Sequence, residues 1–173
     1  MLTSVFDLID MRSFGALWYW IVVAVSWSMA SHWVLGVPYD MVLRARRRGG
    51  ASAEDLRLMA GVAVRRLLGF WRDSGVGLTA AASCALTLLL VLGFGHGVEF
   101  AQALSFIVGP MMVVMALGLW RAVGLERALA AGMTADDLIV ALSRHRFMVQ
   151  AIGGFSVMIT ALWGMAHLIR PYL

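Results

Sequence analysis

The chain of 173 residues is strongly apolar and basic, with 61% hydrophobic residues, a mean hydropathy of +0.84 and a net charge of +4. This composition excludes an ordinary soluble domain and leaves room for one helical membrane domain. The single cysteine, Cys84, excludes an internal disulfide and a cysteine-ligated zinc site. Because Cys84 lies within an apolar run, we expect it to be a small packing residue.

Four runs of the sequence contain no Asp, Glu, Lys or Arg, and each has at least twenty residues. These runs are residues 14–35, 76–95, 101–120 and 147–169. At about 1.5 Å of rise per residue, each run is long enough as a helix to cross a hydrocarbon core of about 30 Å. We therefore predict an all-α membrane protein in which residues 1–173 form a single domain, an antiparallel bundle of four transmembrane helices.

A short helix is expected after the first run. Pro38 suits a first helical turn, because its missing N–H has no helical partner to lose there. Gly49 and Gly50 are expected to stop this helix, which predicts a helix over residues 38–48 on the cytoplasmic side.

Two further helix starts resemble capping boxes, in which an acidic residue lies three positions after Ser or Thr. Ser52 predicts a cytoplasmic helix over residues 53–72 that continues into the second run, with a bend at Ser74–Gly75. Thr134 predicts a second helix that begins at Ala135 and continues into the fourth run.

The orientation follows from the fourteen basic residues, which are all arginines. Twelve of them lie in the connections between the first and second runs and between the third and fourth runs. The connection at 96–100 has none, and the tails contribute Arg12 and Arg170. Short basic loops resist translocation and remain cytoplasmic. We therefore predict that 96–100 is a tight outer turn and that both termini are periplasmic.

The arginines also predict a cytoplasmic surface that docks lipid or a partner, formed by Arg44, Arg46, Arg47, Arg48, Arg65 and Arg66. We expect the 38–48 helix to lie flat on the membrane, with Tyr39, Val42 and Leu43 toward the lipid. Orientation and anionic headgroups explain the positive charge. The expected partners are therefore membrane lipids and either a larger inner-membrane complex or further copies of the chain, and not nucleic acid.

Four histidines lie at the edges of the runs. His32 and His145 are predicted near the inner surface, and His96 and His167 near the outer one, so each pair suits axial ligation of a haem. His96, Glu99 and His167 together suit a metal site with open positions. Imidazole also fits membrane interfaces without a ligand. We therefore predict no cofactor, with a small haem- or metal-binding redox protein as the alternative.

The apolar runs show packing signals and no catalytic motif. Ser156, Thr160 and Gly164 recur every four residues in the last run, a spacing of small residues that lets helices approach closely. No ionisable residue lies near a predicted midplane, which weighs against proton-coupled transport. The sequence has no Gly-rich phosphate loop, nucleophile elbow or two-metal carboxylate set. No catalytic residue is predicted.

Five stretches of the sequence, densest in the first 46 residues, carry a family resemblance: 10–14, 17–20, 31–46, 97–102 and 160–165. They resemble a family of small inner-membrane proteins from alphaproteobacteria, some of which are labelled components of the Suf iron–sulfur cluster assembly complex. It implies a bacterial inner-membrane location and an accessory role, and it transfers no catalytic residue. We therefore expect a non-catalytic accessory or scaffold subunit of an inner-membrane complex.

Overall fold

The computed structural model describes residues 13–169, with side chains from residue 14 to residue 166. These residues are almost entirely helical, which confirms the all-α prediction. The elements, in chain order, are η1 (Ser13–Gly15), α2 (Leu17–His32), β1 (Trp33–Val34), β2 (Val37–Pro38), α3 (Tyr39–Arg48), α4 (Gly50–Leu90), the π-helical η2 (Val91–Gly95), α5 (Glu99–Ala130) and α6 (Ala135–Ile169).

Three helical segments within the described residues are long and apolar enough to cross a membrane: α4 with η2, α5, and α6. The first predicted span, 14–35, is α-helical only over the 16 residues of α2. Ala16 and Trp33 on either side have extended backbone conformations. At about 1.5 Å per residue, α2 is about 24 Å long and therefore shorter than a typical hydrocarbon core.

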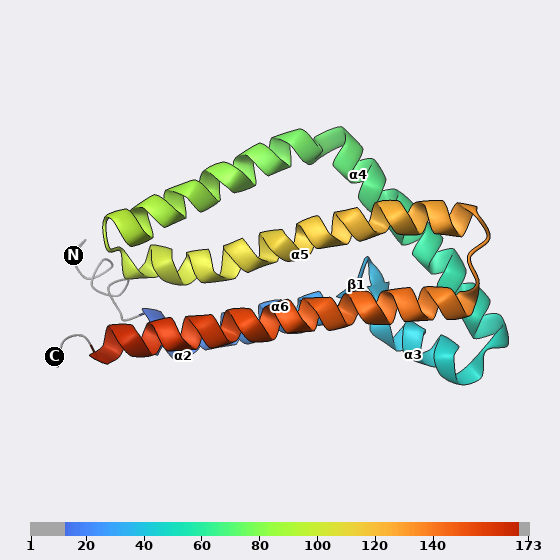
Figure 1. Ribbon diagram of the computed structural model, residues 1–173, viewed down its shortest axis with the longest axis horizontal. Helices are drawn as coiled ribbons and strands as arrows, with labels where there is room; N and C mark the ends of the chain where they lie inside the picture. Colours follow the sequence, from blue (N-terminus) through green and yellow to red (C-terminus); the bar gives the residue numbers. More distant parts are fainter. Residues whose placement is uncertain (1–12, 170–173) are drawn as a thin grey trace, which may run out of the picture.

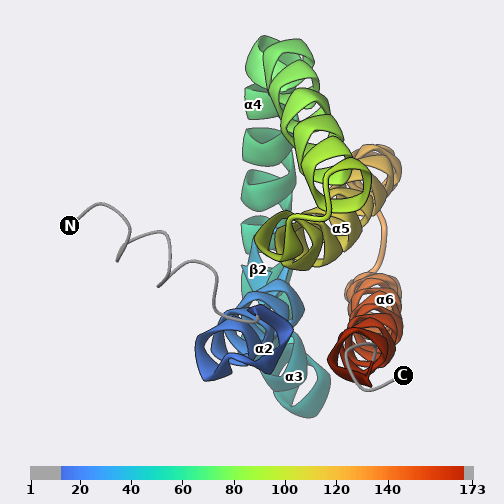
Figure 2. The same cartoon turned by 90° about the vertical axis from the view of Figure 1, so that its left-hand side faces the viewer.

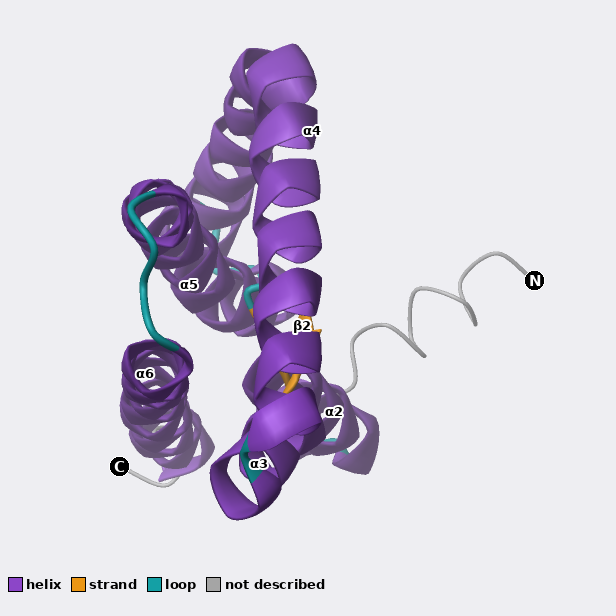
Figure 3. Ribbon diagram, turned by 90° about the vertical axis from the view of Figure 1, so that its right-hand side faces the viewer, coloured by secondary structure: helices purple, strands orange, loops and turns teal. Residues whose placement is uncertain are grey.

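The long helices lie along one axis of the molecule (Figure 1). In the end-on view of Figure 2, α5 lies between α4 and α6, and α2 lies beside α6. The connection between η2 and α5 lies at the same end of the molecule as the start of α2 and the end of α6. At the other end, shown in Figure 3, lie α3, the first part of α4 and the α5–α6 connection. We call this second end the basic end.

An antiparallel β1–β2 hairpin, which the sequence did not predict, connects α2 to α3. Leu35 and Gly36 form its turn with φ values of 53° and 82°. Positive φ at both central turn residues matches the right-handed twist of a tight hairpin. A Cβ on Gly36 would lie 3.2 Å from the Cβ of Ala63 in α4, so the turn packs closely against that helix. Leu35 adopts an unfavourable conformation for a side chain of its size, and its burial in the core holds it there.

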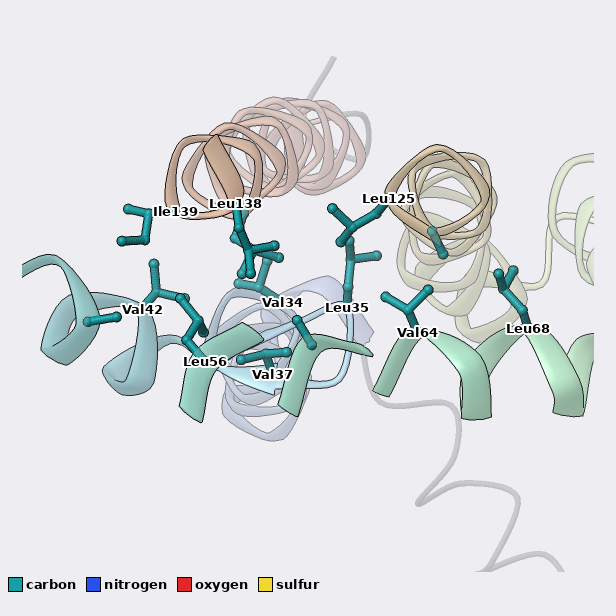
Figure 4. Close-up of a cluster of buried hydrophobic side chains, with 14 residues drawn as sticks. Val34, Leu35, Val37, Val42, Leu56, Val64, Leu68, Leu125, Leu138 and Ile139 are labelled. Carbon is teal, nitrogen blue, oxygen red and sulfur yellow. The ribbon is translucent and has the colours of Figure 1, made fainter. Parts of the chain in front are cut away.

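The hairpin is the centre of a buried hydrophobic cluster at the basic end. Figure 4 shows side chains from α3, α4, α5 and α6 that converge on the hairpin. Its buried members are Val34, Leu35, Val37, Val42, Ala45, Leu56, Ala60, Val64, Leu68, Ala122, Leu125, Leu138, Ile139 and Leu142. The basic end is therefore a packed core of its own, formed by helix ends that extend beyond the charge-free runs.

The two predicted capping boxes have different outcomes. At the start of α6, the N–H of Asp137 donates to Thr134 Oγ1 at 3.2 Å, and that hydroxyl donates to Asp137 Oδ2 at 2.7 Å, which confirms the cap. The cap at Ser52 is wrong. Gly49 has a φ of 59° that turns the chain directly into α4, so Ser52 falls inside the first turn and its N–H donates to the carbonyl of Gly49.

Helix α4 changes direction part-way along its length (Figure 1). Near the bend predicted at Ser74–Gly75, the ring of Trp71 covers Gly75, where a Cβ would lie 2.9 Å from the indole. The hydroxyl of Thr79 donates to the Gly75 carbonyl at 2.7 Å, a bond that competes with the helical ladder and favours bending. The bend directs the apolar half of α4 away from the core at the basic end.

Beyond the bend, α4 contacts α5 on one side, and most of its apolar side chains are exposed. Val76, for example, is 89% exposed. Cys84 is also exposed, so the prediction that it is a packing residue is wrong. In a bilayer, lipid chains cover such a surface without the cost that water imposes.

Gln102 joins three elements at the end opposite the basic end. Its amide donates to the carbonyl of Gly93 in η2 at 2.7 Å and accepts from the indole N–H of Trp163 in α6 at 3.1 Å. A Cβ on Gly93 would lie 2.8 Å from the backbone nitrogen of Gln102. The π-helical turn therefore places a glycine where α4 meets α5.

The cluster at the basic end predicts the effect of a truncation in α6. Leu138 is 0% exposed, so Leu138→Ala is expected to lower the free energy of unfolding by about 2–5 kcal/mol. Val140, 65% exposed on the same helix, supplies the control Val140→Ala, with an expected change within about 0.5 kcal/mol. Circular dichroism during denaturation in detergent micelles measures both. Equal losses in the two variants would contradict this packing.

The Gln102 contacts predict a second effect. Gln102→Leu removes one buried and one partly buried hydrogen bond, at an expected cost of about 1–3 kcal/mol. The control is Gln150→Leu on the exposed face of α6, which is expected to be neutral or stabilising. The same denaturation experiment compares them. Unchanged stability in Gln102→Leu would show that the polar contacts do not hold this end together.

Candidate functional site

The first predicted site is the group of arginines on α3. Arg44, Arg46, Arg47 and Arg48 are exposed at the basic end. Arg44 pairs with Asp40 at 3.4 Å, and the only other ion pair among the described residues joins Arg72 to Glu126. Three of these four guanidinium groups therefore have no carboxylate partner among the described residues.

The apolar face of α3 has a different role from the predicted one. Val42 is fully buried in the core at the basic end, with Ala45 beside it, and Tyr39 packs against that core. The guanidinium of Arg146 in α6 stacks on the Tyr39 ring, with 3.8 Å from Cζ to the ring centroid. The prediction that Tyr39 and Val42 face lipid is therefore wrong, because the protein core covers this side of α3.

Arg65 and Arg66 lie on the exposed part of α4 that precedes the bend. Arg65 lines a depression that also contains Glu54, Arg57 and Glu126, so its surroundings are mixed in charge. Arg66 lines an apolar groove beside Phe70. These two arginines add to the positive charge of the basic end.

The predicted histidine pairs lie in different environments. His32 is exposed at the end of α2 and packs edge-on against Trp33, whereas His145 is buried in α6 with 4% exposure. His96 is exposed in the turn before α5. Glu99 accepts a hydrogen bond from the backbone N–H of Phe14 at 3.2 Å, which ties η1 to the start of α5. The side chain of His167 lies outside the described residues.

No metal-binding group of three His, Cys, Asp or Glu side chains occurs among the described residues. Glu99 has a structural hydrogen bond instead, and His96 points to the surface of a turn. The hydrogen bond from Phe14 therefore gives Glu99 a structural role at the start of α5.

The small residues of α6 all face the interior. Ser156 donates to the carbonyl of Phe106 in α5 at 3.3 Å, and Thr160 donates to the Ser156 carbonyl one turn earlier at 2.8 Å. A Cβ on Gly164 would lie 3.1 Å from the Cβ of Phe14. These three positions let α5 and η1 approach α6 closely.

A pocket that the sequence did not predict lies between α5 and α6 at the basic end. It has a volume of about 340 Å³ and includes Arg121, Arg127 and His145 among its lining residues. Its remaining lining residues are Leu35, Trp120, Val123, Gly124, Leu125, Ala128, Met133 and Ala141. We call it the Arg121–His145 pocket.

The helical spacing of small residues forms this pocket. Arg121, Gly124 and Ala128 follow one another along one face of α5, and Ala141 precedes His145 by one turn of α6. A Cβ on Gly118 would lie 3.6 Å from Leu35 and 4.0 Å from Cε1 of His145. The absence of large side chains at these positions leaves space beside the side chains of Arg121 and His145.

Two side chains that line the Arg121–His145 pocket each have a buried nitrogen without a hydrogen-bond partner among the described residues: Nε of Arg121 and Nδ1 of His145. The Arg121 guanidinium makes only soft contacts, 3.8 Å from the sulfur of Met148 and 5.6 Å from the ring centroid of Trp120. His145 precedes the charge-free run 147–169, and burial, together with the nearby charge of Arg121, lowers its pKa. The imidazole of the free protein is therefore neutral at pH 7.

The sequence contained a signal for this site, in the Trp120–Arg121 pair at the end of one charge-free run and in His145 just before the next. Both positions are expected at the same membrane interface. The sequence did not show that α5 and α6 bring them to the same pocket.

Comparison with protein-family models, with curated proteins and with solved structures finds no match to this chain. The function is therefore inferred from the geometry of the basic end.

Proposed function

We propose that this chain is a non-catalytic accessory or scaffold subunit of a bacterial inner-membrane complex, which uses its basic cytoplasmic end to dock an acidic partner. The observation that supports this best is the α3 surface. Its arginines are exposed and mostly unpaired among the described residues, while the opposite side of α3 is fixed to the core through Val42 and Ala45. A rigid helix with a free basic face suits docking, because little order is lost on binding.

We also propose that α2 crosses the membrane as a fourth span. It lies antiparallel beside α6, and Gly153 of α6 sits directly under the ring of Trp27, where a Cβ would lie 2.6 Å away. The charge-free run continues beyond both ends of α2, through η1 and into β1. A short span of this kind is accommodated by local thinning of the bilayer or by the flanking residues.

This arrangement predicts the sides of three connections. Reporter fusions placed after Arg48, His96 and Gly132 are expected to be periplasm-active only at His96, because the arginine-rich connections resist translocation. A periplasmic signal at Arg48 together with a cytoplasmic one at His96 would reverse the orientation. A cytoplasmic N-terminal fusion that leaves these three results unchanged would remove α2 from the spans.

The docking proposal predicts the effect of removing two charges from α3. Arg46→Gln with Arg47→Gln is expected to lower partner recovery from native membranes by roughly 30-fold, since each arginine near an acidic surface contributes about 1 kcal/mol. The measurement is co-purification with mass spectrometry, beside thermal stability in detergent.

The matched control for this pair is Arg57→Gln with Arg72→Gln, which removes the same charge from the exposed side of α4. It is expected to keep partner recovery near that of the wild type. Equal losses in both double variants would show a general charge effect and contradict docking through α3. A collapse of stability in the α3 variant would indicate a structural role instead.

A further inference from the structure

The Arg121–His145 pocket differs in charge from the depression beside Arg65 at the basic end. Its lining includes two arginines and a histidine and no carboxylate. The depression beside Arg65 also has two arginines, but Glu54 and Glu126 balance them. The Arg121–His145 pocket therefore carries a net positive charge that no lining residue neutralises.

The two arginines of the lining, together with unpartnered nitrogens on Arg121 and His145, favour a ligand with oxygen acceptors. Buried polar groups in native proteins nearly always have a partner, and an exception calls for an explanation. Nε of Arg121 and Nδ1 of His145 are such exceptions among the described residues, and both side chains line the same pocket, with His145 only 4% exposed. An arginine Nε–H and an imidazole N–H both donate to phosphate oxygens, and arginine matches the geometry of that group especially well.

The walls and the position of the pocket indicate an amphiphile. Leu35, Val123, Leu125 and Met133 make the lining largely apolar beside its cationic groups. Trp120, 71% exposed at the end of the charge-free run 101–120, marks the level where indole rings meet lipid headgroups. A pocket of about 340 Å³ also exceeds what a single phosphate group fills.

We propose that the Arg121–His145 pocket binds the phosphate of an anionic phospholipid, with Arg121, His145 and Arg127 around the phosphate and the apolar wall against the glycerol and the first part of the acyl chains. This inference rests on the membrane location proposed above. It is independent of docking through α3, because His145 and Ala141 lie on a different side of α6 from Val140 and Arg144, which border Arg46 of α3. Bound lipid at this place joins α5 to α6 where Leu35 is held in its turn.

The test uses the full chain in a phosphate-free detergent after removal of bound lipid. Phosphatidylglycerol, phosphatidylcholine and inorganic phosphate are titrated separately, with chloride added to keep the ionic strength equal. Native mass spectrometry measures the bound lipid, and the melting temperature measures the stabilisation. We expect phosphatidylglycerol to bind and stabilise the wild type, with phosphatidylcholine at least tenfold weaker.

The variants are Arg121→Gln and His145→Gln, with Arg57→Gln on α4 as the control for lost charge. Each pocket variant is expected to weaken phosphatidylglycerol binding at least tenfold, whereas the control leaves it near that of the wild type. Arg127→Gln gives a further variant at an exposed side chain, because substitution of the buried His145 or the half-buried Arg121 can also affect folding. If Arg121→Gln and Arg127→Gln bind phosphatidylglycerol as tightly as the control Arg57→Gln, the site is overturned.

The arms of the experiment also separate the two sources of phosphate. Inorganic phosphate could raise the melting temperature as much as phosphatidylglycerol does, with the increase lost in Arg121→Gln. That result would support the phosphate site and overturn the lipid assignment. Loss of partner recovery in the α3 variant with unchanged lipid binding would support the two surfaces as separate. Lipid binding that follows the α3 arginines instead would overturn the pocket as its site.

Discussion

Burial of the β1–β2 hairpin among four helices is the constraint on which the basic end depends. The hairpin reverses the chain between α2 and α3 within a few residues, and its turn residue Leu35 holds an unfavourable conformation because its side chain is enclosed. Gly36 packs against α4, and Val34 and Val37 enter the same cluster. This one contact therefore sets the positions of α3 and the first part of α4.

The same burial fixes both basic regions to one core. Val42 and Ala45 bind α3 to the core, which leaves its arginines facing outward. Leu35 and Leu125 line the Arg121–His145 pocket and are also part of the core, so the wall of the pocket is held rigidly. Such a wall suits the proposed phosphate site, because side chains that are already held in place lose little freedom when a ligand binds.

The rest of the molecule has much less internal packing, and the proposed membrane location explains this contrast. At the basic end, water drives apolar side chains together. Along the charge-free runs, lipid chains are as apolar as leucine, so helices associate through close contacts and hydrogen bonds. Gly153 under Trp27, Ser156 on α5 and the Gln102 network are contacts of this type. The exposed half of α4 agrees with the same explanation.

The sequence alone determined the all-α class, the long helices, the helix over Tyr39–Arg48 and the cap at Thr134, because these depend on composition, periodicity and local hydrogen bonding. Only the tertiary structure decided that Val42 faces protein, that Cys84 is exposed and that Arg121 meets His145. Those outcomes depend on which helix faces pack together. Arg121 and His145 are 24 positions apart, and the sequence does not show that they become neighbours. The hairpin was missed for the same reason, since a leucine at positive φ is stable only within the core that encloses it.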